Sequence, residues 1–321
     1  MSCCTHTANA TRSGDPTNTR SLRQAFIAEL ARRMRRVRGL VRTTVGYEND
    51  ALELTGNADP EETFGVSTDP ARLREFEAWL RNAIREELVE PKPPSPVQSG
   101  AHWTAEYVRR AYLVGYNQAT GRLFQQGVSV DNPDDEDILN LPTPRRQLRQ
   151  LYLRAFEALE SVPTEAAQQV RETLTVGLDE GANPRELASR LNQELESITR
   201  DRLATIARSE IINSHSEATL DRYEDAGVDV VSHGEWATAA DTRVCAICEA
   251  LEGKAFTITE MREATFEMEG VSFEIRLKPP AHPNGRCTIL PAVGADPPAS
   301  PLQERLPDSP AQQAATARVV A

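Results

Sequence analysis

Lysine is rare and long apolar runs are missing in this chain of 321 residues. Lysine occurs only at Lys92, Lys254 and Lys278, so nearly every basic side chain is an arginine. No apolar run is long enough to cross a bilayer, and the apolar core of a signal peptide does not follow the polar N-terminus. We therefore expect no membrane partner and synthesis in a reducing compartment.

Composition bounds the architecture and the partners. Hydrophobic residues make up 39% of the chain, enough for a core in part of it but hardly throughout. The formal net charge of −12 excludes a surface that binds nucleic acid everywhere, so any DNA contact has to be local. The arginine usage is typical of a GC-rich genome, and together with the acidic excess it fits a halophilic organism.

The most informative stretch carries three of the five cysteines. Cys245 and Cys248 form a C-x-x-C pair, and His282 and Cys287 follow after a long insert. Each pair can chelate one edge of a tetrahedron, so the four residues predict a structural Zn²⁺ site that closes a small module. Strand-like runs at 253–256 and 271–275 lie between the pairs, and Asn284-Gly285 predicts a turn beside His282.

Other interpretations of these residues remain open. The cysteines could be ordinary thiols, or Cys245 and Cys248 a disulfide; Cys3, Cys4 and His6 lie in a tail that cannot preorganise a metal site. His215 and Glu217 with the C-x-x-C pair resemble part of a zinc deaminase signature, although a lone histidine there is typical of a helix surface. A zinc-knuckle protein that binds or cleaves nucleic acid is a third interpretation, for which His233 is the remaining nearby histidine.

Apolar spacing predicts an α+β protein that is predominantly helical before this module. We expect flexible tails at 1–19 and 293–321, a helical region over 20–226 with a Pro/Ser linker near 91–100, and the module over 227–292. An acidic loop is expected at 48–70 and another at 132–137. Helices are expected at 21–45, 71–88, 104–126, 144–159, 163–178, 184–195 and 200–226, and a strand at 228–236.

The first of these helices carries an arginine belt. One interpretation is a solvated face in an acidic protein. The other is contact with DNA or with an acidic partner, for which Arg32, Arg33, Arg35 and Arg36 are the candidates.

Around the zinc ligands, several residues are candidate supports. Arg208 and Glu210 lie two apart on a helix, so we expect them to anchor separate neighbours, one of which is the module. Trp236, Asp241 and Arg243 precede the first pair, and Asp241 is a candidate acceptor for the imidazole of His282 or for Arg286. None of these roles requires catalysis.

Five segments in this order resemble the phage Mu F-like head morphogenesis family, the minor capsid proteins of tailed viruses. They are Ile206–Glu210, Trp236–Thr238, Asp241–Cys248, Leu251–Gly253 and Pro280–Cys287. The resemblance implies a minor head protein that is not an enzyme, located in the host cytoplasm during assembly and then in the virion, inside the head near the portal. It implies portal, capsid or scaffold proteins as partners and a role in assembly or genome delivery. Gly285 stands where many relatives have a cysteine, so His282 becomes the necessary fourth ligand.

Overall fold

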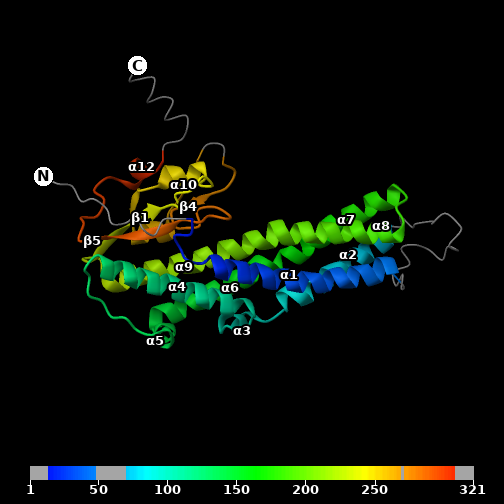
Figure 1. Ribbon diagram of the computed structural model, residues 1–321, viewed down its shortest axis with the longest axis horizontal. Helices are drawn as coiled ribbons and strands as arrows, with labels where there is room; N and C mark the ends of the chain where they lie inside the picture. The colour runs from blue at the N-terminus through cyan, green and yellow to red at the C-terminus, as the bar shows by residue number, and fades with distance from the viewer. Residues whose placement is uncertain (1–13, 48–69, 269–270, 308–321) are drawn as a thin grey trace, which may run out of the picture. The chain divides into compact units, whose positions relative to one another are not determined.

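The computed structural model describes residues 14–47, 70–268 and 271–307 (Figure 1). It is mainly helical, with a three-stranded and a two-stranded antiparallel sheet formed late in the chain. The predicted class, a predominantly helical region followed by a small α/β part, is therefore confirmed. None of the helices within the described ranges has the length and apolar character that a bilayer crossing needs.

The α-helices before the sheets are α1 (Arg20–Arg42), α2 (Pro70–Ile84), α3 (Pro94–Gln98), α4 (Thr104–Gln125), α5 (Asp135–Asn140), α6 (Pro142–Glu160), α7 (Val162–Asp179), α8 (Pro184–Ile198) and α9 (Ala204–Ala226). Later come the short helices α10 (Ala246–Leu251), α11 (Ile258–Glu263) and α12 (Leu302–Arg305). The strands are β1 (Val231–Ala237), β2 (Ala255–Thr257), β3 (Thr265–Phe266), β4 (Ile275–Arg276) and β5 (Thr288–Val293).

Helix boundaries follow local signals where these are strong. Asn183 caps α8 through its side chain, which accepts from the Glu186 N–H at 3.0 Å, and Pro184 occupies the first helical position. Three predictions need correction. Residues 94–98 of the expected linker form α3, residues 135–140 form α5 instead of continuing a loop, and a π-helical turn at Thr199–Leu203 precedes α9.

The expected tails are partly structured. Thr17 and Thr19 are buried, and the Gly14 N–H donates to the Ala239 carbonyl at 3.4 Å. Beyond β5, Arg305 of α12 donates to the Ala255 carbonyl at 2.9 Å. The rest of both tails (1–13, with Cys3, Cys4 and His6, and 308–321) and the expected acidic loop at 48–69 lie outside the described residues.

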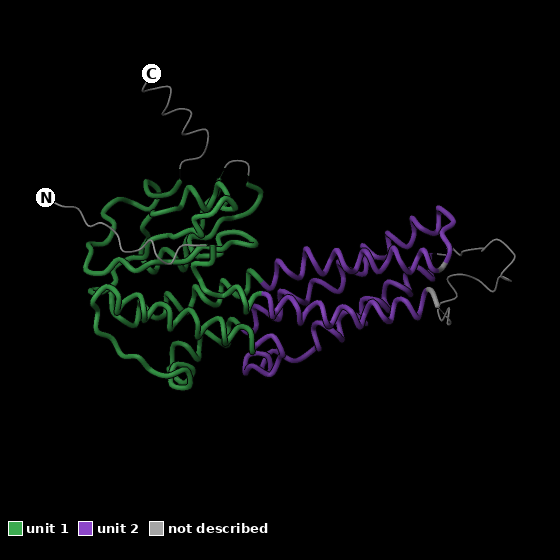
Figure 2. Tube along the Cα trace, in the orientation of Figure 1, with its two compact units in different colours: residues 1–23, 106–151, 208–321 green, residues 24–105, 152–207 purple. Residues whose placement is uncertain are grey.

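The chain divides into two compact units, each built from segments that are distant in sequence (Figure 2). Unit 1 comprises residues 1–23, 106–151 and 208–321, and unit 2 comprises residues 24–105 and 152–207. The domain boundary that we expect at residue 226 stays a prediction.

Unit 2 is helical, and α1 contributes its apolar stripe to the core. Phe26, Leu30, Met34, Val37 and Val41 recur every three or four residues and are all at most 1% exposed. Polar contacts join α1 to residues that follow α2. Arg33 donates to the Glu87 carbonyl at 2.8 Å, pairs with Glu90 at 2.5 Å and lies over the Trp103 ring at 4.2 Å.

Unit 1 contains the larger sheet, with strand order β2-β1-β5 and both pairings antiparallel. Its core combines the sheet with two helices. Trp236 of β1, Phe256 of β2 and Ile289 of β5 belong to the same buried cluster as Leu123 of α4 and Tyr223 of α9. The sheet thus buries its apolar side chains together with those of α4 and α9.

Helix α9 is the central element of unit 1, since every residue from Glu210 to Tyr223 is buried. Two of its carboxylates are matched by partners from other elements. Asp221 accepts from Tyr112 of α4 and from Arg262 of α11, and Glu217 pairs with Lys278 and Arg262. Burial raises the pKa of Asp221, which makes these hydrogen bonds necessary to keep its carboxylate ionised.

Helices α4 and α9 approach each other closely, and this leads to a prediction about the free energy of unfolding. A Cβ on Gly115 would lie 2.2 Å from the His215 carbonyl oxygen, whereas a Cβ on Gly121 of the same helix meets nothing within 4 Å. We expect Gly115→Ala to lower the free energy of unfolding by about 1–3 kcal/mol, because a helix must shift. Gly121→Ala should raise it by up to about 1 kcal/mol through helix propensity. Urea unfolding of both variants checks this, and equal effects would contradict the close approach.

Candidate metal centre

The C-x-x-C pair lies at the start of α10. Cys245 is the N-cap residue and Cys248 lies in the first turn, so a spacing of three places both thiols on the same side. Cys248 is 3% exposed and belongs to the core cluster of unit 1, whereas Cys245 is half-buried. One thiol is therefore fixed by core packing and the other faces the edge of the site.

The second pair is positioned by a tight turn. The Gly285 N–H donates to the His282 carbonyl at 3.1 Å, and Asn284 has a φ of 66°. Proline at the second position and a positive φ at the third are typical of a type II turn, and asparagine tolerates that φ. The chain reverses here, and Cys287 immediately precedes β5.

The two pairs converge. His282 Nε2 lies 3.0 Å from Cys245 Sγ and 3.2 Å from Cys248 Sγ. The ligand atoms of these three residues lie within 4.8 Å of one another, the one such metal-compatible group among the described residues. Cys287 hydrogen-bonds to Cys248 and lines the same pocket, which has a volume of about 30 Å³. All four predicted ligands therefore meet at one place.

The hydrogen bond of the second imidazole nitrogen defines the tautomer of His282. Its Nδ1 lies 2.8 Å from the Pro283 carbonyl oxygen, which can only accept. Nδ1 therefore carries the proton, and the lone pair of Nε2 points at the thiols. A backbone acceptor on the distal nitrogen is the usual arrangement of metal-binding histidines.

The thiols influence one another. Cys245, Cys248 and Cys287 are all free, so the alternative of a Cys245–Cys248 disulfide is not what the structure contains. The hydrogen bond with Cys287, together with burial, raises the pKa of Cys248. The same hydrogen bond lowers the pKa of Cys287, which favours its thiolate.

Charged groups brace the loops that carry the ligands. Arg286 donates to both carboxylate oxygens of Asp241 at 2.7 Å, so of the two partners considered for Asp241 it is Arg286 that is bound. The Arg243 N–H and guanidinium also donate to Asp241, each at 3.0 Å. Arg286 therefore ties the residue before Cys287 to the loop before Cys245, and it holds the pKa of Asp241 well below its usual range.

Helix α9 contacts the second pair. Arg208 donates to the Asn284 side chain at 3.2 Å, and the Asn284 N–H approaches Ser209 Oγ at 3.4 Å. Glu210 is buried, on a different side of α9 from Arg208. Trp236 is fully buried in the core cluster that includes Cys248 and Cys287. Arg208 thus contacts the site through the Asn284 side chain, and Trp236 contacts it through the core around Cys248 and Cys287.

Sequence reasoning missed several of these contacts. Ser209 and Asn284 connect α9 to the turn, and Glu252 accepts from the Thr238 N–H at 2.6 Å across the base of the first loop. Asn284 had a signal, since Asn-Gly predicts a turn, but nothing in the local pattern shows which helix it meets.

The remaining candidate residues lie away from the thiols. His215 is fully buried, and its Nε2 lies 2.7 Å from Gln118 Oε1. The expectation of a helix-surface histidine was therefore wrong, because α9 is covered on all sides. Burial lowers the pKa of His215 to about 3, so it stays neutral. Glu217 is engaged by Lys278 and Arg262, and His233 hydrogen-bonds to Ser232.

The donor set fits zinc. Zn–S distances near 2.3 Å and Zn–N distances near 2.0 Å place sulfur and nitrogen ligands about 3.5 Å apart in a tetrahedron. The observed separations of 3.0 and 3.2 Å are within about half an ångström of that value. Three thiols and one correctly protonated imidazole are also a common structural zinc set.

Residues 168–290 match the model of the family described as Phage Mu protein F like protein. This segment belongs to the phage Mu F-like family. It includes all four candidate ligands and the whole of α9, which carry much of the resemblance. No curated protein and no solved structure shows a significant match to the chain.

The Asp241–Arg286 ion pair leads to a prediction about how stability depends on pH. Because the folded pKa of Asp241 is lowered by hydrogen bonds from Arg286, its stabilising effect should be complete above about pH 4 and be lost as pH falls further. Asp241→Asn should therefore lower the melting temperature clearly at pH 7, and the difference from wild type should shrink progressively as pH falls below about 4. Melting curves of wild type, Asp241→Asn, Arg286→Gln and the double variant test this. A coupling between the two sites that does not vary with pH would contradict it.

Proposed function

We propose that this chain is a minor head protein of a tailed virus that associates with the portal vertex and acts in head morphogenesis or genome delivery. In this proposal Cys245, Cys248, His282 and Cys287 hold a structural Zn²⁺. The observation that carries it is that Cys245, Cys248 and His282 converge, with Cys287 lining the same pocket, within the phage Mu F-like segment. The family is one of head morphogenesis proteins, which supports a place in the virion.

The arrangement of the thiols supports a bound cation. One imidazole lone pair can accept only one S–H hydrogen, yet His282 Nε2 lies at nearly equal distances from two sulfurs. A metal bound by all of them would satisfy every group at once. When bound, zinc would supply cross-linking: it would join α10, the turn after Pro279 and the start of β5.

The shape of the site favours a structural role over a catalytic one. A volume of about 30 Å³ admits one or two water-sized molecules and no nucleobase. A catalytic zinc keeps a position open for water and substrate, whereas a closed site uses four protein ligands. The residues that a deaminase would need, His215 and Glu217, are held by Gln118, Lys278 and Arg262 instead.

Metal content separates the two roles. Because His282 is the fourth ligand in our proposal, His282→Ala should lose zinc at chelator concentrations that wild type withstands. His215→Gln should retain zinc in its folded fraction, although it is destabilised by the change in a packed core. Zinc per folded chain is measured after gel filtration, and Co²⁺ substitution reports thiolate ligation. Retention by His282→Ala and loss by His215→Gln would refute the structural site.

Portal association is tested in assembling heads. We expect the chain to be incorporated into heads that contain portal protein and to be scarce in heads assembled without it. Deletion of residues 308–321 should preserve incorporation, because it leaves β5 and the Arg305–Glu260 pair intact. Quantitative immunoblots of purified heads check both points. Equal incorporation with and without portal protein would contradict the proposed location.

A further inference from the structure

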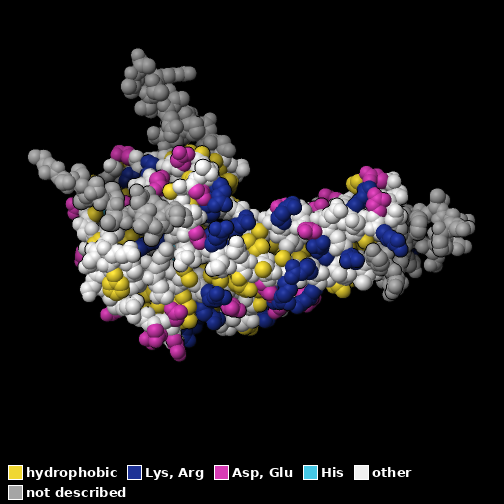
Figure 3. Space-filling view, in the orientation of Figure 1, with side chains coloured by type: hydrophobic (Ala, Val, Ile, Leu, Met, Phe, Trp, Pro, Cys, Tyr) yellow, Lys and Arg dark blue, Asp and Glu magenta, His cyan; other side chains and the backbone are white. Residues whose placement is uncertain are grey.

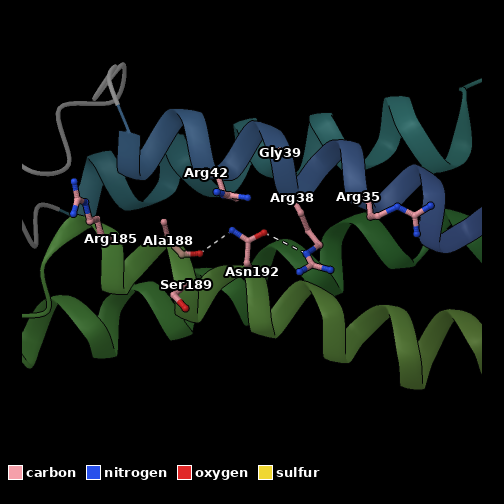
Figure 4. Close-up of a pocket in the computed structure, with 8 residues that line it drawn as sticks. All are labelled: Arg35, Arg38, Gly39, Arg42, Arg185, Ala188, Ser189 and Asn192. Atoms are coloured by element: carbon pink, nitrogen blue, oxygen red, sulfur yellow. Dashed lines mark hydrogen bonds between the residues drawn. The ribbon is translucent and has the colours of Figure 1, made fainter.

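A groove lined by arginines lies within unit 2, on the surface between α1 and α8 (Figure 4). Its volume is about 460 Å³. Helix α1 contributes one wall and α8 the other, and none of the described residues that line the groove carries a carboxylate. The lining residues are Arg35, Arg38, Gly39 and Arg42 of α1, and Arg185, Ala188, Ser189 and Asn192 of α8.

The groove arginines differ from the other arginines of the belt. Arg32 pairs with Glu29, Arg36 with Glu87 at 2.9 Å, and Arg33 is buried against Glu29 and Glu90. These three positive charges are neutralised within the unit. The structure thus divides the belt predicted from the sequence, and of its four candidates only Arg35 lines the groove.

Positive charge in the groove is available to a ligand. Arg35 and Arg185 are exposed and form no ion pair with any residue in the described ranges. Arg42 is also exposed. Figure 3 shows Lys and Arg side chains along the surface of the unit 2 helices, on a chain whose net charge is −12. The groove is therefore a local basic site in an acidic protein.

One guanidinium is held in place before any ligand arrives. Arg38 Nε donates to the Asn192 side-chain oxygen at 3.2 Å, and the Asn192 amide donates to the Ala188 carbonyl at 2.8 Å. Arg38 also pairs with Glu196 at 3.1 Å. Asn192, itself 8% exposed, thus orients Arg38 across the groove.

The groove has small residues between its long cationic ones. Gly39 and Ala188 leave space between the arginines, and a Cβ on Gly39 would meet nothing within 4 Å. Arg35, Arg38 and Arg42 span seven residues of α1, about 10 Å along the helix. Guanidinium groups at this spacing can contact successive phosphates, each through paired hydrogen bonds.

We propose that this groove binds the phosphodiester backbone of duplex DNA without reading its sequence. A protein partner would need a buried apolar or aromatic centre, and the lining offers arginines, an amide, a hydroxyl and small residues instead. Contacts of this kind fix a protein on DNA but carry no base information. The proposal rests on neither the metal site nor the head location, because the groove belongs wholly to unit 2.

Paired double variants of the full chain test the groove. Arg35→Gln/Arg185→Gln removes two charges that have no acidic partner, and Arg32→Gln/Arg36→Gln removes two that are paired with glutamates. Binding of a fluorescent duplex of mixed sequence is measured by anisotropy over a salt series. The log–log slope should fall by about 2 in the groove variant, since each phosphate contact contributes about 0.9, and should change little in the control.

Melting curves of both variants confirm folding, so that lost binding reports on the groove. A polyglutamate probe separates DNA from an acidic protein segment as the occupant. If the groove variant loses polyglutamate binding but keeps duplex binding, or if both double variants weaken duplex binding equally, the proposal is overturned. Weaker duplex binding in the groove variant alone, equal for duplexes of different sequence, supports it.

Discussion

The burial of a polar helix is the constraint on which unit 1 depends. Helix α9 has hardly any apolar stripe, yet its residues from Glu210 to Tyr223 are all inaccessible to solvent. A buried charge without a partner costs several kcal/mol, so each must find a complementary group. Those groups come from α4, from α11 and from the segment around Lys278. Satisfying α9 therefore fixes where the elements around the thiol cluster lie.

The thiol cluster relies on that framework and adds to it. The core of unit 1 includes Cys248 and Cys287 together with residues of α4 and α9. The region from Trp236 to Pro291 therefore shares a core with these helices and is not a separate module with a small core. A metal in the site would restrain loops that are already placed by Arg286, Asn284 and the sheet. Its main effect would then be local, on the first turn of α10 and on the turn after His282.

The sequence pattern predicted those features that depend on residues close to one another in the chain. The stripe of α1, the cap of α8 and the convergence of Cys245, Cys248, His282 and Cys287 follow from spacing and turn chemistry. The environment of His215 did not, because a polar helix is typical of a surface and only tertiary contacts reveal that α9 is enclosed. The partners of the arginine belt were hidden for the same reason. Glu87 and Glu90 are more than fifty positions from the arginines they neutralise.

The interleaving of the two units sets an order of events during synthesis. All segments of unit 2 have been made once residue 207 leaves the ribosome. Helix α4 of unit 1 has by then been made for about eighty residues, while its partners α9, β1 and β5 are still missing. Since segments generally fold in the order in which they emerge, unit 2 can fold first. The apolar side of α4 then stays uncovered until the last third of the chain has been made. A ribosome that stalls between α8 and β5 would therefore release a chain with one finished unit and one exposed, aggregation-prone helix.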